Sequence, residues 1–207
     1  MKLHYRSIEL LVAACVVVIS LASLFVALYQ GRVMQRTMEA SVMPLIQIGH
    51  GNFDAEDDAW QIKIEVTNTG LGPAQVHYLA MRWQGELITD TSDFMAACCV
   101  PDSVPEAERL DYMYSLFREG EMALIFDDVQ MRFLAPQETV DFISFDQPDA
   151  ETRPRGHAVW RAVDRARHDI SYEVCYCSVF DQCWMSTFPR QSREPVRQCV
   201  PPSPEAG

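Results

Sequence analysis

The alternation of apolar and polar residues divides the chain into two parts that meet near residue 44. From Leu10 to Leu28 every residue is apolar or small, and only Ser20 and Ser23 carry polar side chains. An α-helix rises about 1.5 Å per residue, so this run can cross the roughly 30 Å hydrocarbon core of a bilayer. Beyond residue 44 the apolar residues recur mainly at every second position, which is typical of half-buried strands. The pattern predicts a membrane helix followed by a mainly β domain.

Two kinds of cleaved leader are alternatives for the apolar run. Small residues at 20–22 imitate the cleavage site of a secretory signal peptide, and small residues before Cys15 imitate a lipoprotein signal. Both leaders have a shorter apolar core, whereas this run continues through Leu28. We therefore expect an uncleaved signal anchor over residues 8–30, with Cys15 as a small apolar residue facing lipid or a neighbouring helix.

The anchor sets the expected domain organisation. Residues 1–7 are predicted to be a cytoplasmic tail, and residues 31–43 a helical stalk that ends before Pro44, because the residue before proline is disfavoured in a helix. Residues 44–200 form the expected β domain. The Pro-rich end, residues 201–207, is predicted to be disordered.

Cysteine content favours an oxidising compartment for the domain. The basic residues before and after the helix (Lys2 and Arg6, then Arg32 and Arg36) give only a slight orientation preference. The part beyond the helix holds an even set of cysteines, and the tail holds none. This set consists of Cys98, Cys99, Cys175, Cys177, Cys183 and Cys199. We expect a single-pass protein of the bacterial inner membrane with its C-terminal domain in the periplasm; the alternative is a reduced, metal-binding set in the cytosol.

The charge balance limits the partners. The tail and membrane helix hold Lys2, Arg6 and Glu9, so of 17 basic and 29 acidic residues the rest of the chain carries 15 and 28, a net charge of −13. Such a surface repels phosphate groups and anionic lipids, so nucleic acid is not an expected partner.

The periodicity beyond the stalk predicts strands and two helices. The expected strands are residues 45–48, 60–67, 74–83, 122–126, 129–134 and 140–145, and a final hairpin over 170–188. The expected helices are residues 105–118 and 157–168, with Arg161, Arg165 and Arg167 of the second helix facing solvent. Cys98 and Cys99 are placed in a loop, and Val76, Tyr78 and Ala80 on one face of their strand. The predicted core consists of Ile62, Ile64, Val66, Val76, Tyr78, Phe142, Val174 and Tyr176.

A turn between two of these strands carries a resemblance. The sequence Asn68-Thr69-Gly70-Leu71-Gly72-Pro73 combines glycines that allow positive φ with a proline that fixes the exit. No helix or lysine follows to make it a phosphate loop. The string VTNTGLGPAQV resembles the strand-turn-strand of CARDB-like β-sandwiches in single-span bacterial envelope proteins. The resemblance implies an immunoglobulin-like antiparallel β-sandwich, here with two inserted helices.

The cysteines have two interpretations. If the last hairpin turns near Phe180, Cys177 lies opposite Cys183, within reach of a disulfide. We then expect Cys98 and Cys99 to lie near Cys175 or Cys199, although six cysteines allow 15 pairings. The alternative is a Cu(I) site formed by Cys175 and Cys177, which share one face of a strand. With its Cys-aromatic-Cys sequence, the chain is distantly similar to the membrane-anchored copper chaperones for cytochrome oxidase, which place such a pair on an immunoglobulin-like domain.

No catalytic motif is found in the sequence: it lacks a His-Glu-x-x-His pair, a nucleophile elbow and a nucleotide loop. We expect a non-enzymatic extracytoplasmic protein without a cofactor, which acts as an accessory subunit beside a membrane-protein partner. The alternative function is Cu(I) binding of the chaperone type.

Overall fold

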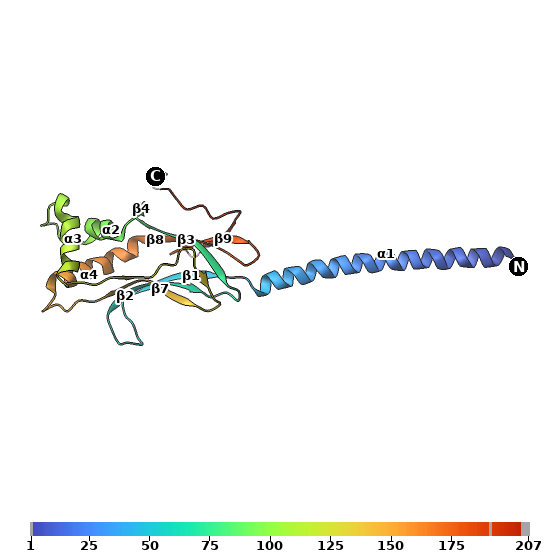
Figure 1. The fold of residues 1–207 in the computed structure, drawn as a ribbon, viewed down its shortest axis with the longest axis horizontal. Helices are drawn as coiled ribbons and strands as arrows, with labels where there is room; N and C mark the ends of the chain where they lie inside the picture. Colours follow the sequence, from blue (N-terminus) through green and yellow to red (C-terminus); the bar gives the residue numbers. More distant parts are fainter. Residues whose placement is uncertain (1, 191, 204–207) are drawn as a thin grey trace. The chain divides into compact units, whose positions relative to one another are not determined.

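A computed structural model describes residues 2–190 and 192–203, and it separates the chain into two compact units, Met1–Val42 and Met43–Gly207. The first unit is a single helix, α1 (Lys2–Ser41), which runs without interruption through the predicted tail, anchor and stalk (Figure 1). Its segment Glu9–Ser41 is long and apolar enough to cross a membrane. The Ser20 hydroxyl donates to the Val16 carbonyl oxygen (2.8 Å), so this polar group is satisfied inside the apolar run. Of the predicted disordered end, residues 204–207 lie outside the described part.

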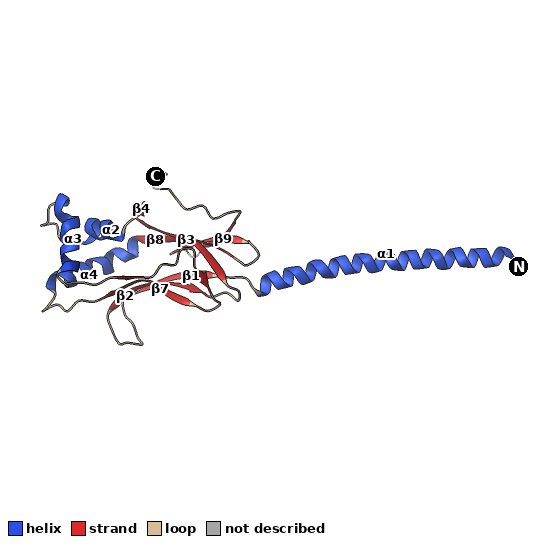
Figure 2. Ribbon diagram, viewed as in Figure 1, coloured by secondary structure: helices blue, strands red, loops and turns tan. Residues whose placement is uncertain are grey.

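The second unit contains two antiparallel sheets among its described residues (Figure 2). The four-stranded sheet has the order β1 (Ile46–Gly51), β2 (Gln61–Asn68), β7 (Thr139–Asp146), β5 (Ile125–Phe126). The other sheet has the order β10 (Ser192–Val196), β9 (Cys183–Phe188), β8 (Ile170–Cys177), β3 (Ala74–Trp83), β4 (Glu86–Ile88), and β6 (Phe133–Leu134) also pairs with β3. The prediction of a mainly β domain after an apolar N-terminal helix is confirmed.

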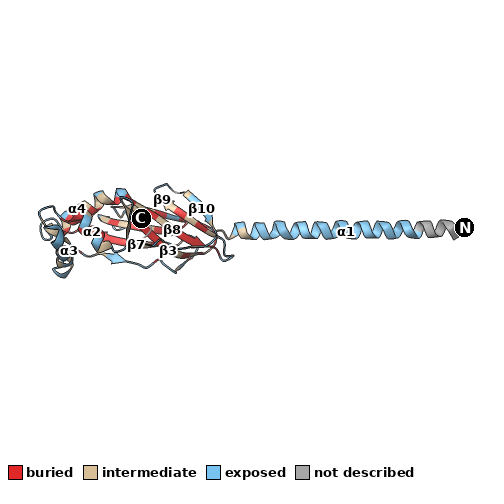
Figure 3. Ribbon diagram, turned by 90° about the horizontal axis from the view of Figure 1, so that it is seen from above, coloured by how far each residue is buried: buried red, intermediate tan, exposed pale blue. Residues whose placement is uncertain are grey.

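Buried residues of both sheets form one hydrophobic core. Figure 3 shows the buried residues of the ribbon in red. In β2 every second residue is buried, as the alternation predicts. The predicted core residues that join this cluster are Ile62, Ile64, Val66, Val76, Val174 and Tyr176.

Two predicted core residues stand apart from this buried cluster, and each lies at a register shift. Phe142 falls where the pairing of β7 with β2 skips a residue, and its side chain is only partly buried at the margin of the core. Tyr78 follows a second register shift, between β3 and β8. It is buried, but with Ala80 in a separate cluster, so Val76 does not share a face with Tyr78 and Ala80. A bulge adds one residue to a strand and thereby interrupts the two-residue alternation.

Three α-helices occur among the described residues of the domain, not two. The predicted pair corresponds to α3 (Arg109–Arg118), preceded by a 3₁₀ turn (Glu106–Glu108), and to α4 (Pro154–Ala166). The additional helix is α2 (Thr91–Cys99), so Cys98 and Cys99 end a helix and do not lie in a loop. The Asp90 side chain caps α2 by accepting hydrogen bonds from two backbone N–H groups of the first turn, and Phe94 and Met95 are buried.

Arg167 is buried, contrary to the prediction that it faces solvent. It begins the 3₁₀ turn (Arg167–Asp169) that follows α4, four residues after the buried Val163, so it continues the buried face of the helix, whereas Arg161 and Arg165 lie on the exposed face. Its guanidinium donates to the Asp164 carboxylate (2.8 Å) and to Nδ1 of His50. The buried charge is therefore paired, as buried charges generally are.

Candidate functional site

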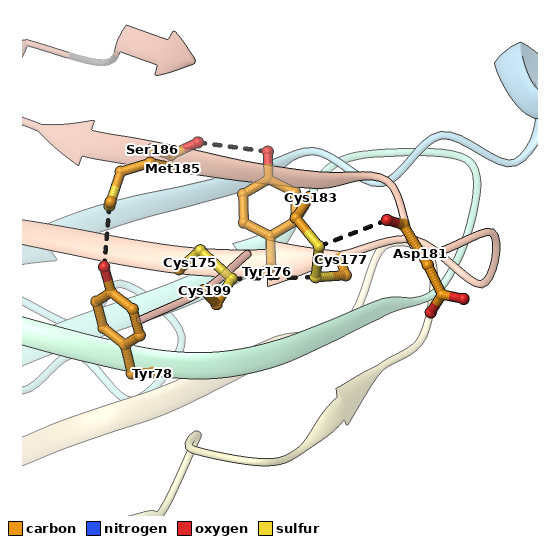
Figure 4. Close-up of a disulfide and its surroundings, with 9 residues drawn as sticks. All are labelled: Tyr78, Cys175, Tyr176, Cys177, Asp181, Cys183, Met185, Ser186 and Cys199. Atoms are coloured by element: carbon orange, nitrogen blue, oxygen red, sulfur yellow. Dashed lines mark hydrogen bonds between the residues drawn. A yellow bond between two sulfur atoms is a disulfide. The ribbon is translucent and has the colours of Figure 1, made fainter. Parts of the chain in front are cut away.

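A cluster of sulfur atoms covers the outer face of the six-stranded sheet (Figure 4). Strand β8 alternates: Tyr172, Val174 and Tyr176 enter the shared core, whereas Cys175 belongs to the cluster on the opposite face. Cys177 lies two residues further along that face. The segment after β10 crosses this face and brings Cys199 onto Cys175. This segment thereby covers a second, smaller hydrophobic core on the outer face of the sheet.

Three disulfides are present among the described residues. Cys177 and Cys183 are joined across the β8–β9 hairpin (Cα–Cα 4.0 Å), the pair that the hairpin register predicts. Cys175 is joined to Cys199 (Cα–Cα 5.6 Å).

Cys98 and Cys99 bond to each other (Cα–Cα 3.7 Å), so the prediction that they lie near Cys175 or Cys199 is wrong. The reason is that the sheet separates the two groups of sulfur atoms. Cys99 is buried in the core shared by both sheets, and Cys98 packs against that core. Cys175 lies in the cluster on the opposite face of the six-stranded sheet.

A bulge in β3 adds a histidine to the sulfur cluster. Val76 pairs with Tyr176 and Tyr78 pairs with Cys175, which leaves His77 as the extra residue of the strand. The ligand atoms of His77, Cys177 and Cys199 all lie within 4.8 Å of one another. The alternation of the sequence does not indicate this position, because the bulge depends on the pairing with β8.

The two disulfides of the cluster are close but differ in exposure. The Sγ atoms of Cys177 and Cys199, which belong to different bridges, are 4.0 Å apart. Cys175 is fully buried and Cys177 nearly so, whereas Cys183 and Cys199 are partly exposed. Reagents in solution therefore reach one sulfur of each bridge more readily than the other.

Tyr78 and Met185 complete the cluster. The Tyr78 hydroxyl donates to Sδ of Met185 (3.3 Å), as Figure 4 shows. Burial raises the pKa of Tyr78, and the nearby Glu173 carboxylate raises it further. The phenol therefore stays protonated and acts as a hydrogen-bond donor.

A second feature is an exposed apolar stretch that we call the crossing segment, residues 125–133. It runs from β5, at the edge of the four-stranded sheet, to β6 beside β3. The buried Val129 and the ion pair between Arg132 and Asp127 (2.9 Å) hold it in place. Large apolar side chains nevertheless face solvent along it: Ile125, Phe126, Met131 and Phe133, which are 62%, 50%, 68% and 61% exposed.

The turn motif has a structural role. Asn68 is fully buried, and its side-chain oxygen accepts from the backbone N–H groups of Leu45 (3.2 Å) and Gly70 (3.1 Å). Its amide nitrogen donates to three carbonyl oxygens, those of Gly72, Leu134 and Ala135 (2.8–3.1 Å). Asn68 thus joins the chain entering β1 to the β2–β3 turn and to the loop after β6.

The glycines and the proline of the motif fit the same role. A Cβ on Gly70 would collide with the backbone of Met43, Pro44 and Leu45, so only glycine fits there. Gly72 is buried and supplies one of the carbonyl oxygens that Asn68 binds, and Pro73 directly precedes β3.

A cluster of titratable groups surrounds Arg167. His50 contacts the Arg167 guanidinium, and its ring packs edge-on against His168 (5.4 Å between centroids) and Phe188 (5.2 Å). Burial lowers the pKa of His50, and the positive charge of Arg167 and the His168 ring lower it further, while Asp164 opposes the shift. His50 is therefore held neutral and accepts a hydrogen bond from the arginine.

No protein-family model, curated protein or solved structure matches this chain. Its function is therefore inferred from the geometry of the residues described above.

Proposed function

We propose that this chain is a non-enzymatic, membrane-anchored accessory protein of the bacterial inner membrane whose periplasmic domain binds another protein. The crossing segment is the observation that carries the proposal. Single exposed apolar residues are common on soluble domains. Here four large apolar side chains, each at least half exposed, fall within nine residues of the chain, and grouped exposed apolar side chains mark interaction sites.

The crossing segment has the properties of a preformed binding surface. Val129 is buried, and backbone hydrogen bonds join Asp127 N–H to the Phe142 carbonyl oxygen (3.2 Å) and Val76 N–H to the Arg132 carbonyl oxygen (2.9 Å). The backbone is thus held in place, so little conformational entropy is lost when a partner binds. Its strand β5 ends the four-stranded sheet, and an edge strand offers free backbone groups to an extended partner segment. Burying one large apolar side chain contributes about 1.5–3 kcal/mol, so a few such residues suffice for binding.

The charge distribution supports a basic partner. The exposed Asp128 lies two residues after Phe126 in the sequence, and the chain beyond residue 9 carries a net charge of −13. A partner segment with apolar residues flanked by Lys or Arg complements this surface.

The cysteines support the location of the domain outside the cytosol. The structure places all six cysteines of the domain at disulfide distances, and such bonds persist in oxidising compartments. With α1 as an uncleaved signal anchor, the domain then lies in the periplasm. Two antiparallel sheets that share one core support the immunoglobulin-like β-sandwich that the turn motif implies.

Site-specific photo-cross-linking in intact membranes tests the protein-binding proposal. A photoreactive residue at Phe126 of the full chain is expected to give an adduct of defined mass, and Phe133→Asp should reduce its yield several-fold. Glu56, which is exposed in the β1–β2 loop, provides the control position and should give no such adduct. Equal adducts at both positions, or no adduct at Phe126, would refute the proposal.

A second candidate function, Cu(I) binding, is favoured by the placement of His77 beside the sulfur cluster. Cys175 and Cys177 are both in disulfides, so a reductant must act before their sulfurs can bind metal. The reduced cluster offers thiolates and an imidazole, which suit Cu(I), and His77 lies near Cys177 and Cys199. Titration of the reduced full chain in detergent with Cu(I) tests this function. Stoichiometric binding that is lost in both Cys177→Ser and His77→Ala would support it, and no binding would exclude it.

A further inference from the structure

The two disulfides on the outer face of the six-stranded sheet are near neighbours. Cys175 and Cys177 are two residues apart on β8 and lie on the same face, so their bridges run side by side (Figure 4). Between the two bridges, Sγ of Cys177 and Sγ of Cys199 are 4.0 Å apart. Each of these atoms is bonded to a different partner, Cys183 and Cys175 respectively.

In each bridge one sulfur is accessible, that of Cys183 in the hairpin bridge and that of Cys199 in the other. Cys183 is partly exposed at the start of β9, next to the exposed hairpin turn at residues 179–182. Cys177 is nearly buried and Cys175 is fully buried. A thiol in solution therefore reaches the hairpin bridge at Cys183, and the sulfur it displaces, that of Cys177, remains inside the cluster.

We infer that these two bridges are coupled by thiol–disulfide exchange. An external dithiol reduces the Cys177–Cys183 bridge, and the freed Cys177 thiolate then forms a disulfide with Cys199 and releases Cys175. This inference concerns the sulfur cluster and does not depend on the crossing segment or on metal binding.

The first step is an attack by one thiolate of the dithiol on Sγ of Cys183. A mixed disulfide forms between the dithiol and Cys183, the Cys177–Cys183 bond breaks, and Cys177 leaves as a thiolate. The second thiol of the dithiol then attacks the mixed disulfide. The dithiol leaves in its oxidised form, and Cys183 becomes a thiol after taking up a proton.

The second step lies within the chain. The Cys177 thiolate attacks Sγ of Cys199, a Cys177–Cys199 bond forms, the Cys175–Cys199 bond breaks, and Cys175 leaves as a thiolate that takes up a proton from solvent. Two electrons have then passed from the dithiol to the protein, and one of its two disulfides in the cluster is lost. Because the reacting sulfurs are held close together, this step is favoured over a second attack from solution.

The exchange has a structural outcome. The C-terminal segment remains bonded to β8 through Cys199, now at Cys177, while the hairpin is opened and thiols appear at Cys175 and Cys183. The cluster thus accepts electrons from a dithiol without releasing the segment that covers the sheet.

A matched pair of variants tests the exchange in the full chain in detergent. Cys183→Ser leaves Cys177 as a thiol beside Cys199, and Cys177→Ser leaves Cys183 as a thiol on the far side of the hairpin. Both lose the same disulfide, so they differ only in which sulfur is free. Free thiols are trapped by acid quench and alkylation and located by fragment-ion mass spectrometry.

In Cys183→Ser we expect alkylation to be divided between Cys175 and Cys177 at comparable levels, with a Cys177–Cys199 cross-link in the digest. In Cys177→Ser we expect alkylation within the cluster at Cys183 alone; Cys15, which forms no disulfide, is alkylated in both variants. Alkylation of the cluster confined to Cys177 in Cys183→Ser would overturn the inference.

The wild-type chain provides a test that does not depend on a variant that folds. One molar equivalent of dithiothreitol should produce the Cys177–Cys199 bridge together with thiols at Cys175 and Cys183. If partial reduction yields only thiols at Cys177 and Cys183, with Cys175–Cys199 intact, the two bridges are independent and the inference is wrong.

Discussion

Asn68 is predicted to be the most sensitive polar position of the domain, and Asn68→Ala is the perturbation that tests this. The substitution removes the partners of two buried N–H groups and three carbonyl oxygens while leaving the backbone unchanged. A net contribution of about 0.5–1.5 kcal/mol per hydrogen bond gives, for five bonds, a total loss of about 2.5–7.5 kcal/mol. That is a large part of the roughly 5–15 kcal/mol that stabilises a typical domain.

The assay is urea unfolding of the full chain in detergent, followed by tryptophan fluorescence. Asn52→Ala is the matched control, because its side chain donates a single hydrogen bond, to Asp164 (3.3 Å). The control should lose about 1 kcal/mol or less. If Asn68→Ala costs no more than the control, the five hydrogen bonds do not act together and the reasoning is refuted.

Asn68→Asp separates hydrogen bonding from side-chain volume. The carboxylate keeps the bonds from Leu45 and Gly70 but turns a negative oxygen toward three carbonyl oxygens. The folded state therefore raises the pKa of the new carboxyl group, so the unfolded state releases its proton at lower pH. We expect the variant to be less stable at pH 7 than at pH 5, because the protonated acid can donate one bond.

Three further predictions concern residues that are buried or partly buried. Tyr172→Phe should leave the free energy of unfolding unchanged or raise it by up to about 1 kcal/mol, because the buried hydroxyl has no hydrogen-bond partner among the described residues; a loss above that amount in urea unfolding would contradict this. The folded state lowers the pKa of His50 below its ordinary value of 6.5, so the unfolded state binds more protons as the pH falls through that value. The free energy of unfolding should therefore be highest above pH 6.5 and decline toward pH 5.5, and His50→Gln should reduce this decline. If the variant shows the same decline, groups other than His50 cause it. Gly156→Ala should destabilise by about 1–3 kcal/mol, since a Cβ there meets the Glu121 carbonyl oxygen, whereas Gly49→Ala, which meets nothing within 4 Å, should change the midpoint of thermal unfolding little.

The sequence predicts a strand well where every second side chain enters the core without interruption, because the apolar residues then alternate regularly. In β2 every second side chain faces the shared core, so the pattern of apolar residues alone locates the strand. The helix α4 is similar, because Val159 and Val163 lie four residues apart on one face and both are buried. The apolar N-terminal helix is predicted by length and composition in the same way.

The features that were missed depend on partners far away in the sequence. The bulge at His77 exists only in the pairing of β3 with β8, and it moves Tyr78 to the sulfur cluster. The Cys175–Cys199 bridge depends on the path of the C-terminal segment over the sheet, which no local pattern encodes. For α2 a local signal was available, namely Asp90 as a helix N-cap before buried residues at helical spacing. The immunoglobulin-like fold stays a prediction.

The way the chain enters the domain after α1 determines how the domain bears mechanical load applied at that point. The carbonyl oxygen of Met43 accepts hydrogen bonds from the N–H groups of Leu71 (3.1 Å) and Gly72 (3.4 Å), and that of Leu45 accepts from Thr69 (2.8 Å). Tension on the chain at Met43 is thus resisted first by the turn between β2 and β3, whose two strands belong to different sheets. The tension is therefore shared by both sheets before it acts on the hydrogen bonds that pair β1 with β2. A tethered domain built in this way resists being peeled open, strand by strand, from its point of attachment.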